Sequence, residues 1–267
     1  MYKLFFIGTG KMATAIAGGI VRSGVVACNE MAGFDIDQAA AELFEKNTGI
    51  KAFSDDLRSV LEDAEVVLIA VKPQMIRSAL KDLQGILQGK TVFSIAAGVT
   101  ISQLQELTAS GRIIRIMPNT PALVGCGAAG FSASPEAEET DIEFAGAILK
   151  AVGEAFLLPE SQLDAVTALS GSGPAYVFEF IQALADGGVA EGLPRDVALK
   201  LAARTVAGAA SMVLQSDLHP QQLKDNVTSP GGTTSRALEL MAERGFNGIV
   251  MQSVRAAAAR ARELGGK

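Results

Sequence analysis

The stretch Leu4-Phe-Phe-Ile-Gly-Thr-Gly-Lys-Met-Ala-Thr-Ala15 decides the fold of this chain. A short run of strand-forming residues ends at Gly8, and a helical pattern begins almost at once. Gly8, Gly10 and Ala13 occupy the three small-residue positions of the dinucleotide-binding fingerprint. The first allows a tight turn, the second lets a pyrophosphate approach the backbone, and the third lets the helix lie close to the strand. The stretch therefore predicts a strand, a phosphate-binding turn and a helix, whose free N–H groups and dipole favour an anion.

The composition narrows the class of protein. The chain has 267 residues, of which 49% are apolar and 19% charged, enough for one large domain or two modest ones with a sizeable core. A net charge of −6 without a dense basic stretch argues against nucleic acid as a partner. Cys28 and Cys126 have no companion Cys or His at ligand spacing, and His219 is the single histidine, so no metal site is expected. The absence of a basic leader and of an apolar run of membrane length predicts a cytoplasmic protein with no membrane partner.

The first part of the chain alternates short apolar runs with amphipathic helical patterns. Such alternation is typical of a parallel sheet covered by helices on both faces. Helices are expected at 11–23, 37–45 and 136–150, and Ser54 and Asp55 are placed to cap another. After the opening strand, further strands are expected to end near 35 and to cover 50–53, 65–71, 91–95, 112–117, 128–132 and 154–158. The pattern predicts a Rossmann-type, doubly wound α/β domain over residues 1–158.

From residue 159 the chain has helical periodicity, and no buried strand is expected. Helices are expected after residues 170–174, after 192–194, after His219-Pro220 and after Ser229-Pro230, with a last one from about 247 to the C-terminus. The terminal helix has a face of small residues, and Ala, Val and Leu recur over 199–214. Together they form more apolar surface than such a domain can cover alone. Residues 159–267 are therefore expected to form an all-helical dimerisation domain that also binds the substrate.

Asp35 ends the second expected strand, at the place where a dinucleotide-binding fold has a carboxylate for the adenosine ribose hydroxyls. The alternative is an ordinary aspartate that caps the next helix, a role for which Asp37 competes. Three further strand ends, near Lys72, Ala97 and Asn119, are expected at the same edge of the sheet as the glycine turn. Ligands of doubly wound sheets lie outside the carboxyl ends of the strands, so this edge is the expected cofactor site. A lysine after a strand is more often merely solvated, so Lys72 taken alone does not indicate a binding role.

A second distinctive stretch runs from Leu223 to Leu238, Leu-Lys-Asp-Asn-Val-Thr-Ser-Pro-Gly-Gly-Thr-Thr-Ser-Arg-Ala-Leu. Ser229 is predicted to be the N-cap of a helix and Pro230 its first residue. Two glycines and two threonines in the first turn are poor helix formers, but they leave N–H groups and hydroxyls for a small anion. A plain helix start with a flexible hinge is the alternative.

Several stretches along nearly the whole chain together match one family. They are Phe6-Ile-Gly-Thr-Gly-Lys-Met12, Ala70-Val-Lys-Pro73, Ala96-Ala-Gly-Val-Thr100, Arg115-Ile-Met-Pro-Asn-Thr-Pro121, Leu169-Ser-Gly-Ser-Gly-Pro-Ala-Tyr176, Asp186-Gly-Gly188 and Asp225-Asn-Val-Thr-Ser-Pro-Gly-Gly-Thr-Thr234. With these the chain resembles the pyrroline-5-carboxylate reductases. The glycine turn is shared by many dehydrogenases, whereas the Ser-Gly-Ser-Gly-Pro-Ala-Tyr and Ser-Pro-Gly-Gly-Thr-Thr stretches are much more specific.

The resemblance implies that a hydride from a nicotinamide cofactor reduces the cyclic imine 1-pyrroline-5-carboxylate to L-proline. It implies a homodimer, or a multiple of dimers, with the active site between the cofactor of one subunit and helices of the pair. The substrate carboxylate is expected at the helix start, and the Thr234 hydroxyl beside the imine nitrogen as the catalytic group. The expected substrate-binding residues are Ser229, Gly232, Thr233 and Thr234. The expected cofactor-binding residues are Gly8, Thr9, Gly10, Lys11, Met12, Asp35, Asp56, Val71, Lys72, Ala97, Asn119 and Asn226.

The acidic residues Asp35 and Asp56 depart from the members of the family that favour NADPH. Those members tend to have a small hydroxyl residue and an asparagine at the two places. Carboxylates there would repel a 2′-phosphate, although Lys11 and Lys72 offset this in part. NADH is therefore expected over NADPH.

Two other functions fit parts of the chain. One is another two-domain dehydrogenase, of the β-hydroxyacid or prephenate type. Such an enzyme normally needs a catalytic Lys or His on the first long helix of its second domain, where Ser170–Tyr176 offer neither. The other is a nicotinamide-binding sensor without turnover, which would not need the Ser-Pro-Gly-Gly-Thr-Thr site.

Overall fold

The structure is a computed structural model that describes residues 1–265. Contacts divide it into two compact units, of which the first holds Met1–Ser172 with the chain from Ala257 on, and the second holds Gly173–Ala256. The last strand ends at Leu157, and the helical turns after it stay with the sheet as far as Ser172. The functional boundary at residues 158 and 159 stays a prediction.

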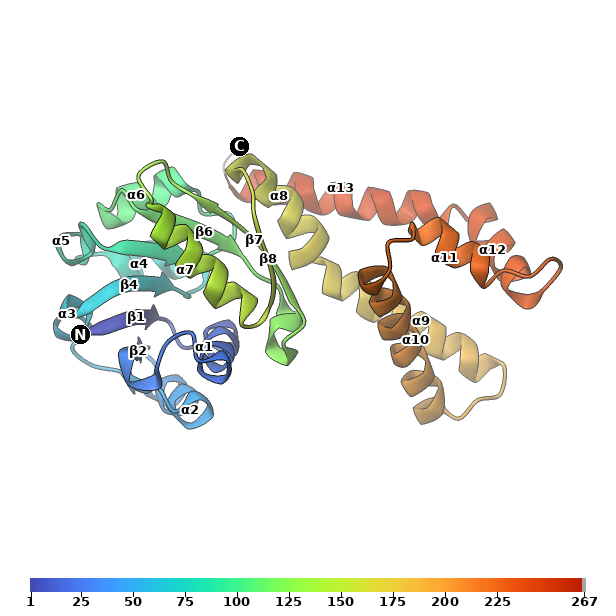
Figure 1. The fold of residues 1–267 in the computed structure, drawn as a ribbon, viewed down its shortest axis with the longest axis horizontal. Coiled ribbons are helices and arrows are strands. Elements are labelled where there is room, and N and C mark those ends of the chain that lie inside the picture. The colour runs from blue at the N-terminus through green and yellow to red at the C-terminus, as the bar shows by residue number, and fades with distance from the viewer. Residues whose placement is uncertain (266–267) are drawn as a thin grey trace. The chain divides into compact units, whose positions relative to one another are not determined.

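In the described residues the first unit is built on an eight-stranded sheet with the order β3-β2-β1-β4-β5-β6-β7-β8 (Figure 1). The strands are β1 (Tyr2–Ile7), β2 (Met31–Phe34), β3 (Lys51–Phe53), β4 (Ala64–Ile69), β5 (Thr91–Ser94), β6 (Ile113–Met117), β7 (Gly127–Ala133) and β8 (Gly153–Leu157). All neighbours are parallel except β6 and β7, which are antiparallel. The chain at 118–126 is too short for the crossover that a parallel pair requires. The predicted doubly wound α/β fold is confirmed.

Side chains of each strand alternate between the two faces of the sheet, so apolar residues lie on both faces. Helices cover both faces and bury these residues. In β1, Leu4 and Phe6 belong to one buried cluster and Phe5 and Ile7 to the other. The first face is covered by α1 (Lys11–Ser23), α2 (Gln38–Thr48) and α7 (Glu139–Lys150). The second is covered by α3 (Leu57–Glu62), α4 (Ile76–Leu80), α5 (Gln84–Leu87) and α6 (Ile101–Thr108). Short helical segments complete the unit: η1 (Cys28–Glu30), η2 (Pro73–Met75), η3 (Thr120–Val124), η4 (Glu160–Gln162), α8 (Leu163–Val166) and η5 (Thr167–Gly171).

Local capping explains where the helices of the first unit differ from expectation. The helix expected at 37–45 continues to Thr48, because Gly49 (φ 74°) ends it in the left-handed conformation. The prediction that Ser54 and Asp55 cap α3 is wrong: Asp56 is the N-cap, and its carboxylate accepts a hydrogen bond from the N–H of Ser59. Three neighbouring residues with similar capping preference made the choice ambiguous in the sequence.

The second unit contains helices throughout. They are α9 (Gly173–Ala190), α10 (Arg195–Gln215), α11 (Pro220–Asn226), α12 (Thr233–Glu243) and α13 (Phe246–Leu264), the last turns of which belong to the first unit. Helices α9 and α10 pack together through Ala185, Ala198 and Ala202. Ion pairing between Arg195 and Asp186 also joins α9 to the start of α10.

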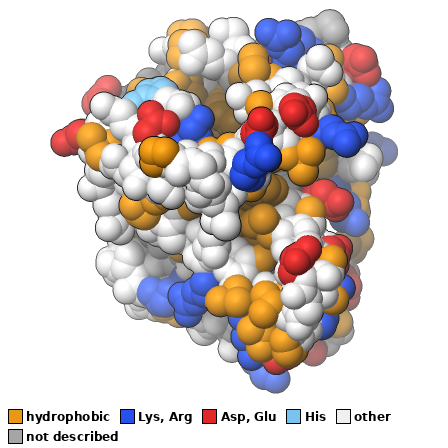
Figure 2. Space-filling view, turned by 90° about the vertical axis from the view of Figure 1, so that its right-hand side faces the viewer, with side chains coloured by type: hydrophobic (Ala, Val, Ile, Leu, Met, Phe, Trp, Pro, Cys, Tyr) orange, Lys and Arg blue, Asp and Glu red, His pale blue; other side chains and the backbone are white. Residues whose placement is uncertain are grey.

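Apolar side chains remain exposed over these helices (Figure 2). Among the described residues, helix α10 is long and apolar enough to cross a membrane, judged by length and composition only. A single helix of this kind is weak evidence for a membrane span. Only 11% of the most apolar 18-residue stretch of α10 is buried within the chain. The exposed residues of α10 include Leu199, Leu201, Met212, Val213 and Leu214.

Candidate active site

The turn at Gly8 joins three strands at the carboxyl edge of the sheet. Its backbone has φ 96°, and its N–H donates to the carbonyl of Phe34 at 2.8 Å. A Cβ atom built on Gly8 would lie 2.9 Å from the carbonyl carbon and oxygen of Ala70. A glycine is required here for two reasons, its positive φ and the close approach of Ala70, the residue after β4.

The start of α1 is arranged to receive an anion. Gly10 is the N-cap, and the described residues provide no side-chain cap for it. A Cβ atom built on Gly10 would meet nothing within 4 Å, so the space before the helix is open. The first helical N–H groups, those of Lys11, Met12 and Ala13, have no acceptor within the helix and lie at the positive end of the helix dipole. A pyrophosphate fits this geometry.

Asp35 and Thr9 are brought together by the pairing of β1 with β2. Asp35 Oδ2 accepts hydrogen bonds from the N–H of Thr9 at 2.8 Å and from its hydroxyl at 3.1 Å. Asp35 Oδ1 accepts from the N–H of Asp37 at 3.1 Å. Asp37 is the N-cap of α2 and accepts from the N–H of Ala39 at 3.0 Å. Asp37 thus has the capping role, and Asp35 holds the glycine turn against β2.

The strands β4 and β5 place Val71, Lys72 and Ala97 at the same edge. The N–H of Ala70 donates to Ile7 O at 2.7 Å, and that of Ile95 donates to Ile69 O at 3.1 Å, so the three strand ends are level. Lys72 and Ala97 are exposed and Val71 is half-buried. The edge therefore offers backbone and small side chains next to the glycine turn. Asp56 lies after β3, further along the sheet, where it caps α3.

Asn119, after β6, forms a closed hydrogen-bond ring with β7 and the turn at Ser170. Its Oδ1 accepts from the N–H of Ala128 at 2.9 Å, and its Nδ2 donates to Ser170 Oγ at 3.0 Å. Ser170 Oγ in turn donates to Ala128 O at 2.7 Å. Ser170 is not among the residues predicted for the site. Its place in the distinctive Ser-Gly-Ser-Gly-Pro stretch was the one signal that pointed to it.

The substrate-site residues expected in the second unit lie on a turn and the helix start after it. The predicted helix start at Ser229 and Pro230 is wrong: α12 begins at Thr233, with Gly232 as its N-cap. Residues 229–232 form a turn in which the N–H of Gly232 donates to Ser229 O at 3.1 Å and Gly231 has φ 67°. Proline followed by a left-handed glycine is a turn signal, and it prevails here over the Ser-Pro helix signal.

This turn leaves the start of α12 uncapped. Among the described residues no side chain caps Gly232, and Thr233 and Thr234 form the first turn of the helix. Thr234 is half-buried, Thr233 is exposed, and Asn226 is the last residue of α11. Free N–H groups and two hydroxyls therefore lie together, as a small carboxylate requires.

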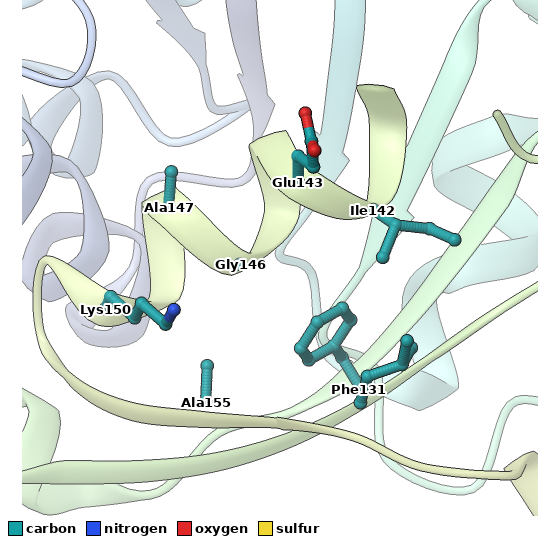
Figure 3. Close-up of a pocket in the computed structure, with 8 residues that line it drawn as sticks. Phe131, Ile142, Glu143, Gly146, Ala147, Lys150 and Ala155 are labelled. Atoms are coloured by element: carbon teal, nitrogen blue, oxygen red, sulfur yellow. The ribbon is translucent and has the colours of Figure 1, made fainter. Parts of the chain in front are cut away.

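A separate groove lies between α7 and the strands β7 and β8 (Figure 3). It has a volume of about 470 Å³, and Phe131, Glu143 and Lys150 are among its lining residues. None of the residues predicted for cofactor or substrate lines it.

The chain matches two family models. Residues 160–264 match the model for pyrroline-5-carboxylate reductase dimerisation, and residues 3–98 match the model for NADP oxidoreductase, coenzyme F420-dependent. The second match covers β1 to β5 of the sheet, and the first covers the helical unit Gly173–Ala256.

Similar proteins extend over nearly the full chain. Pyrroline-5-carboxylate reductase of Glycine max is 46% identical over 98% of this chain and 96% of its own, and that of Methanosarcina acetivorans is 41% identical over 99% and 98%. Among solved structures, a pyrroline-5-carboxylate reductase from Coxiella burnetii has a TM-score of 0.91 at 35% identity, with 98% of both chains covered. The Plasmodium falciparum pyrroline carboxylate reductase with NADP bound has a TM-score of 0.88 at 33% identity, covering 99% and 98%.

The resemblance to the alternative dehydrogenases is limited to the fold. A prephenate dehydrogenase of A. aeolicus has a TM-score of 0.54 at 13% identity. The relatives that are 41% or more identical over nearly the whole length are named as reductases of one kind. The chain belongs to the pyrroline-5-carboxylate reductase family.

Proposed function

We propose that this protein reduces 1-pyrroline-5-carboxylate to L-proline with a hydride from a nicotinamide cofactor. The observation that carries the proposal is the 46% identity to a named reductase over 98% of the chain. The two uncapped helix starts, at Gly10 and Gly232, support it, because the reaction needs one anion site for a dinucleotide and one for a carboxylate.

The cofactor-binding groups in this proposal follow the carboxyl edge of the sheet. The backbone of Gly8, Thr9 and Gly10 and the helix start at Lys11 and Met12 bind the pyrophosphate. Asp35 and Asp56 face the adenosine ribose. Val71, Lys72, Ala97, Asn119 and Asn226 line the rest of the site. The bound cofactor supplies the hydride, and the protein contributes orientation.

The substrate groups in the proposal are at the start of α12. The N–H groups there and the hydroxyls of Ser229 and Thr233 hold the carboxylate, with Gly232 allowing its close approach. The Thr234 hydroxyl contacts the ring nitrogen. An imine that binds already protonated becomes an amine when its carbon accepts a hydride, so no strong acid is required. Thr234 thus orients the ring rather than supplying the proton.

Oligomer and cofactor preference complete the proposal. The active site lies between the cofactor of one subunit and helices of the pair in a homodimer or a multiple of dimers. The exposed apolar residues of α10 and the dimerisation-family match at residues 160–264 support that assembly. NADH is preferred over NADPH, because the Asp35 and Asp56 carboxylates repel a 2′-phosphate. The protein works in the cytoplasm.

An assay with each nicotinamide tests the function. Purified protein is mixed with pyrroline-5-carboxylate and NADH or NADPH, and proline is measured as the product. Proline formation at a rate that depends on protein concentration is expected. Cofactor binding without turnover would favour the sensor, and turnover of a hydroxy acid but not of the imine would favour another dehydrogenase.

A further inference from the structure

The carboxamide of Asn119 has a fixed orientation. Its Oδ1 accepts from Ala128 N–H and its Nδ2 donates to Ser170 Oγ, while Ser170 Oγ donates to Ala128 O. A flipped amide would place its NH₂ group against the N–H of Ala128, two donors facing each other. Asn119 is 8% exposed, so a lost bond in this ring would not be replaced readily by water.

The same turn is packed tightly on β6 and β7. A Cβ atom built on Gly171 would clash with the Met117 methyl group, and one on Gly130 would lie 2.9 Å from Val166. Upstream, Arg115 of β6 pairs with Glu160 at 2.9 Å, and the Arg115 side chain is 5% exposed. The chain from Glu160 to Gly171 is thus fastened to the sheet at both ends, and it finishes in the π-helical turn η5, a type of turn frequent at functional sites.

We propose that Asn119 lines the cofactor site without holding the cofactor itself, and that it is a positioning residue that acts through Ser170. The ring holds the Ser170 turn, which leads directly into α9, at the carboxyl edge where the glycine turn and Ala97 lie. That edge is the proposed cofactor site, so the inference rests on the proposed function. Displacement of the turn misplaces the wall against which the nicotinamide and substrate rings are oriented, and this slows hydride transfer without weakening cofactor binding.

A direct cofactor ligand would behave differently. The Asn119 carboxamide has one amide hydrogen left after its contacts with Ala128 and Ser170. If the cofactor depended on that hydrogen, replacing Asn119 would weaken cofactor binding, and replacing Ser170 would not reproduce the effect. If the ring positions the turn, the two replacements have the same effect, and combining them adds little.

The test compares Ser170→Ala, Ser170→Thr, Asn119→Ala and the double alanine variant in the full-length protein. Ser23→Ala is the matched control, because it removes an exposed hydroxyl that bonds to the Ile20 carbonyl at the far end of α1. Steady-state kinetics give kcat and KM for the imine, and fluorescence titration gives the Kd of the reduced cofactor. For Ser170→Ala and Asn119→Ala, kcat is expected to fall about ten- to hundredfold with the cofactor Kd unchanged within about twofold. Ser170→Thr should recover most of kcat.

An unchanged kcat in Ser170→Ala would overturn the inference. A rise in cofactor Kd confined to Asn119→Ala would also overturn it, as would full additivity of the two effects on kcat in the double variant. Failure of the proposed function looks different, because the unmodified protein would then form no proline. Hydrogen exchange of the Ala128 amide then tests whether Ser170 holds the hydrogen-bond ring in place. Faster exchange in Ser170→Ala than in Ser23→Ala supports it, and equal exchange contradicts it.

Discussion

Asp35 illustrates how one carboxylate serves both structure and the proposed specificity. Its two oxygens accept three hydrogen bonds, two from Thr9 and one from Asp37. The sequence pattern predicts Asp35 at the end of a strand. Its contact with Thr9, which lies 26 residues earlier in the chain, arises from the pairing of β1 with β2. The local sequence pattern predicts where such a strand ends, but it does not predict which distant residue the side chain will contact.

Replacing Asp35 by Ser should shift cofactor preference toward NADPH. Loss of one carboxylate near a screened phosphate is worth on the order of 1 kcal/mol, so the ratio of kcat/KM for NADPH to that for NADH should rise several-fold. The lost acceptor should also lower the free energy of unfolding by about 1–2 kcal/mol. Kinetics with both cofactors and urea denaturation measure the two effects.

Asp37→Ser is the matched control for this change. It removes a carboxylate two residues away and keeps a good N-cap on α2, so neither the ratio nor the stability should change much. An unchanged ratio in Asp35→Ser would mean that the adenosine ribose lies elsewhere or that Lys11 and Lys72 set the preference.

Thr234 is expected to govern substrate orientation. Thr234→Ala should lower kcat/KM for the imine roughly ten- to hundredfold, because a hydrogen bond to a charged group is worth about 1.5–3 kcal/mol. Thr234→Ser keeps the hydroxyl and should recover much of the loss. Steady-state kinetics on both variants, with direct titration of the reduced cofactor, provide the measurement. Full activity in the alanine variant would remove Thr234 from the site, and an equal loss of cofactor affinity would make it a structural residue of α12.

At the scale of elements, the glycine turn before α1 can be compared with Gly24, the glycine that ends α1. Both Gly8 and Gly24 have positive φ, but a Cβ atom would collide with Ala70 at the first and meet nothing within 4 Å at the second. Gly8→Ala should therefore displace β4 from the turn and weaken reduced-cofactor binding at least tenfold. Gly24→Ala should cost about 1 kcal/mol of stability and leave the affinity unchanged. Titration of the cofactor and thermal unfolding distinguish them, and equal affinities would show that the turn tolerates a side chain.

Helix α7 is fastened to the sheet by Asp141, which is 5% exposed. Its carboxylate accepts from Arg112 at 2.7 and 2.9 Å and from the Thr91 hydroxyl at 2.8 Å. Burial raises the pKa of Asp141, but the hydrogen bonds from Arg112, Glu138 N–H and Thr91 outweigh it and lower the pKa below its ordinary value. A lowered pKa in the folded state contributes stability above the unfolded pKa, and this stability is lost as the pH falls through the folded pKa.

Asp141→Asn should thus be less stable than the parent by about 1.5–3 kcal/mol at neutral pH, and the difference should narrow below about pH 4. Urea denaturation at several pH values measures this. Glu138→Gln is the control: its pairing with Arg112 is longer, 3.5 Å, and its side chain is 63% exposed, so the cost should stay below about 1 kcal/mol. A difference independent of pH would contradict the assigned role of the Asp141 charge.

An element is predicted correctly from the sequence where the residues that define it lie within or next to it. Helix α1 was predicted at its observed bounds, because fingerprint, apolar face and terminal Gly24 all lie within it. The start of α12 was wrong, since Ser229-Pro230 serves a turn as readily as a helix cap. The Asn119–Ser170 bond spans 51 residues and depends on the packing of η5 against β7, which no periodicity encodes.

At the scale of the whole molecule, the two units differ in how well they bury their apolar residues. The sheet has strongly buried clusters on both faces, whereas the cluster between α9 and α10 consists of three buried alanines with Ile181 and Val189 against it. Large apolar side chains of α10 lie on the surface instead, among them Leu201 at 54% and Leu214 at 75% exposure. A chain with so much exposed apolar surface on one helix is expected to cover it with a second copy.

Leu201→Glu should therefore weaken self-association. A carboxylate introduced at an interface between α10 helices would be desolvated without a partner, so the dimer dissociation constant should rise at least tenfold. Leu43→Glu on α2 is the matched control, because Leu43 is similarly exposed, at 57%, on the nucleotide-binding unit. Sedimentation velocity at low micromolar concentration should show a dimer or a multiple of one for the parent and the control, and smaller species for Leu201→Glu. Activity should fall with the loss of the dimer, since the proposed site needs helices of the pair. A folded, fully active monomer in either variant would show that one chain completes the site alone.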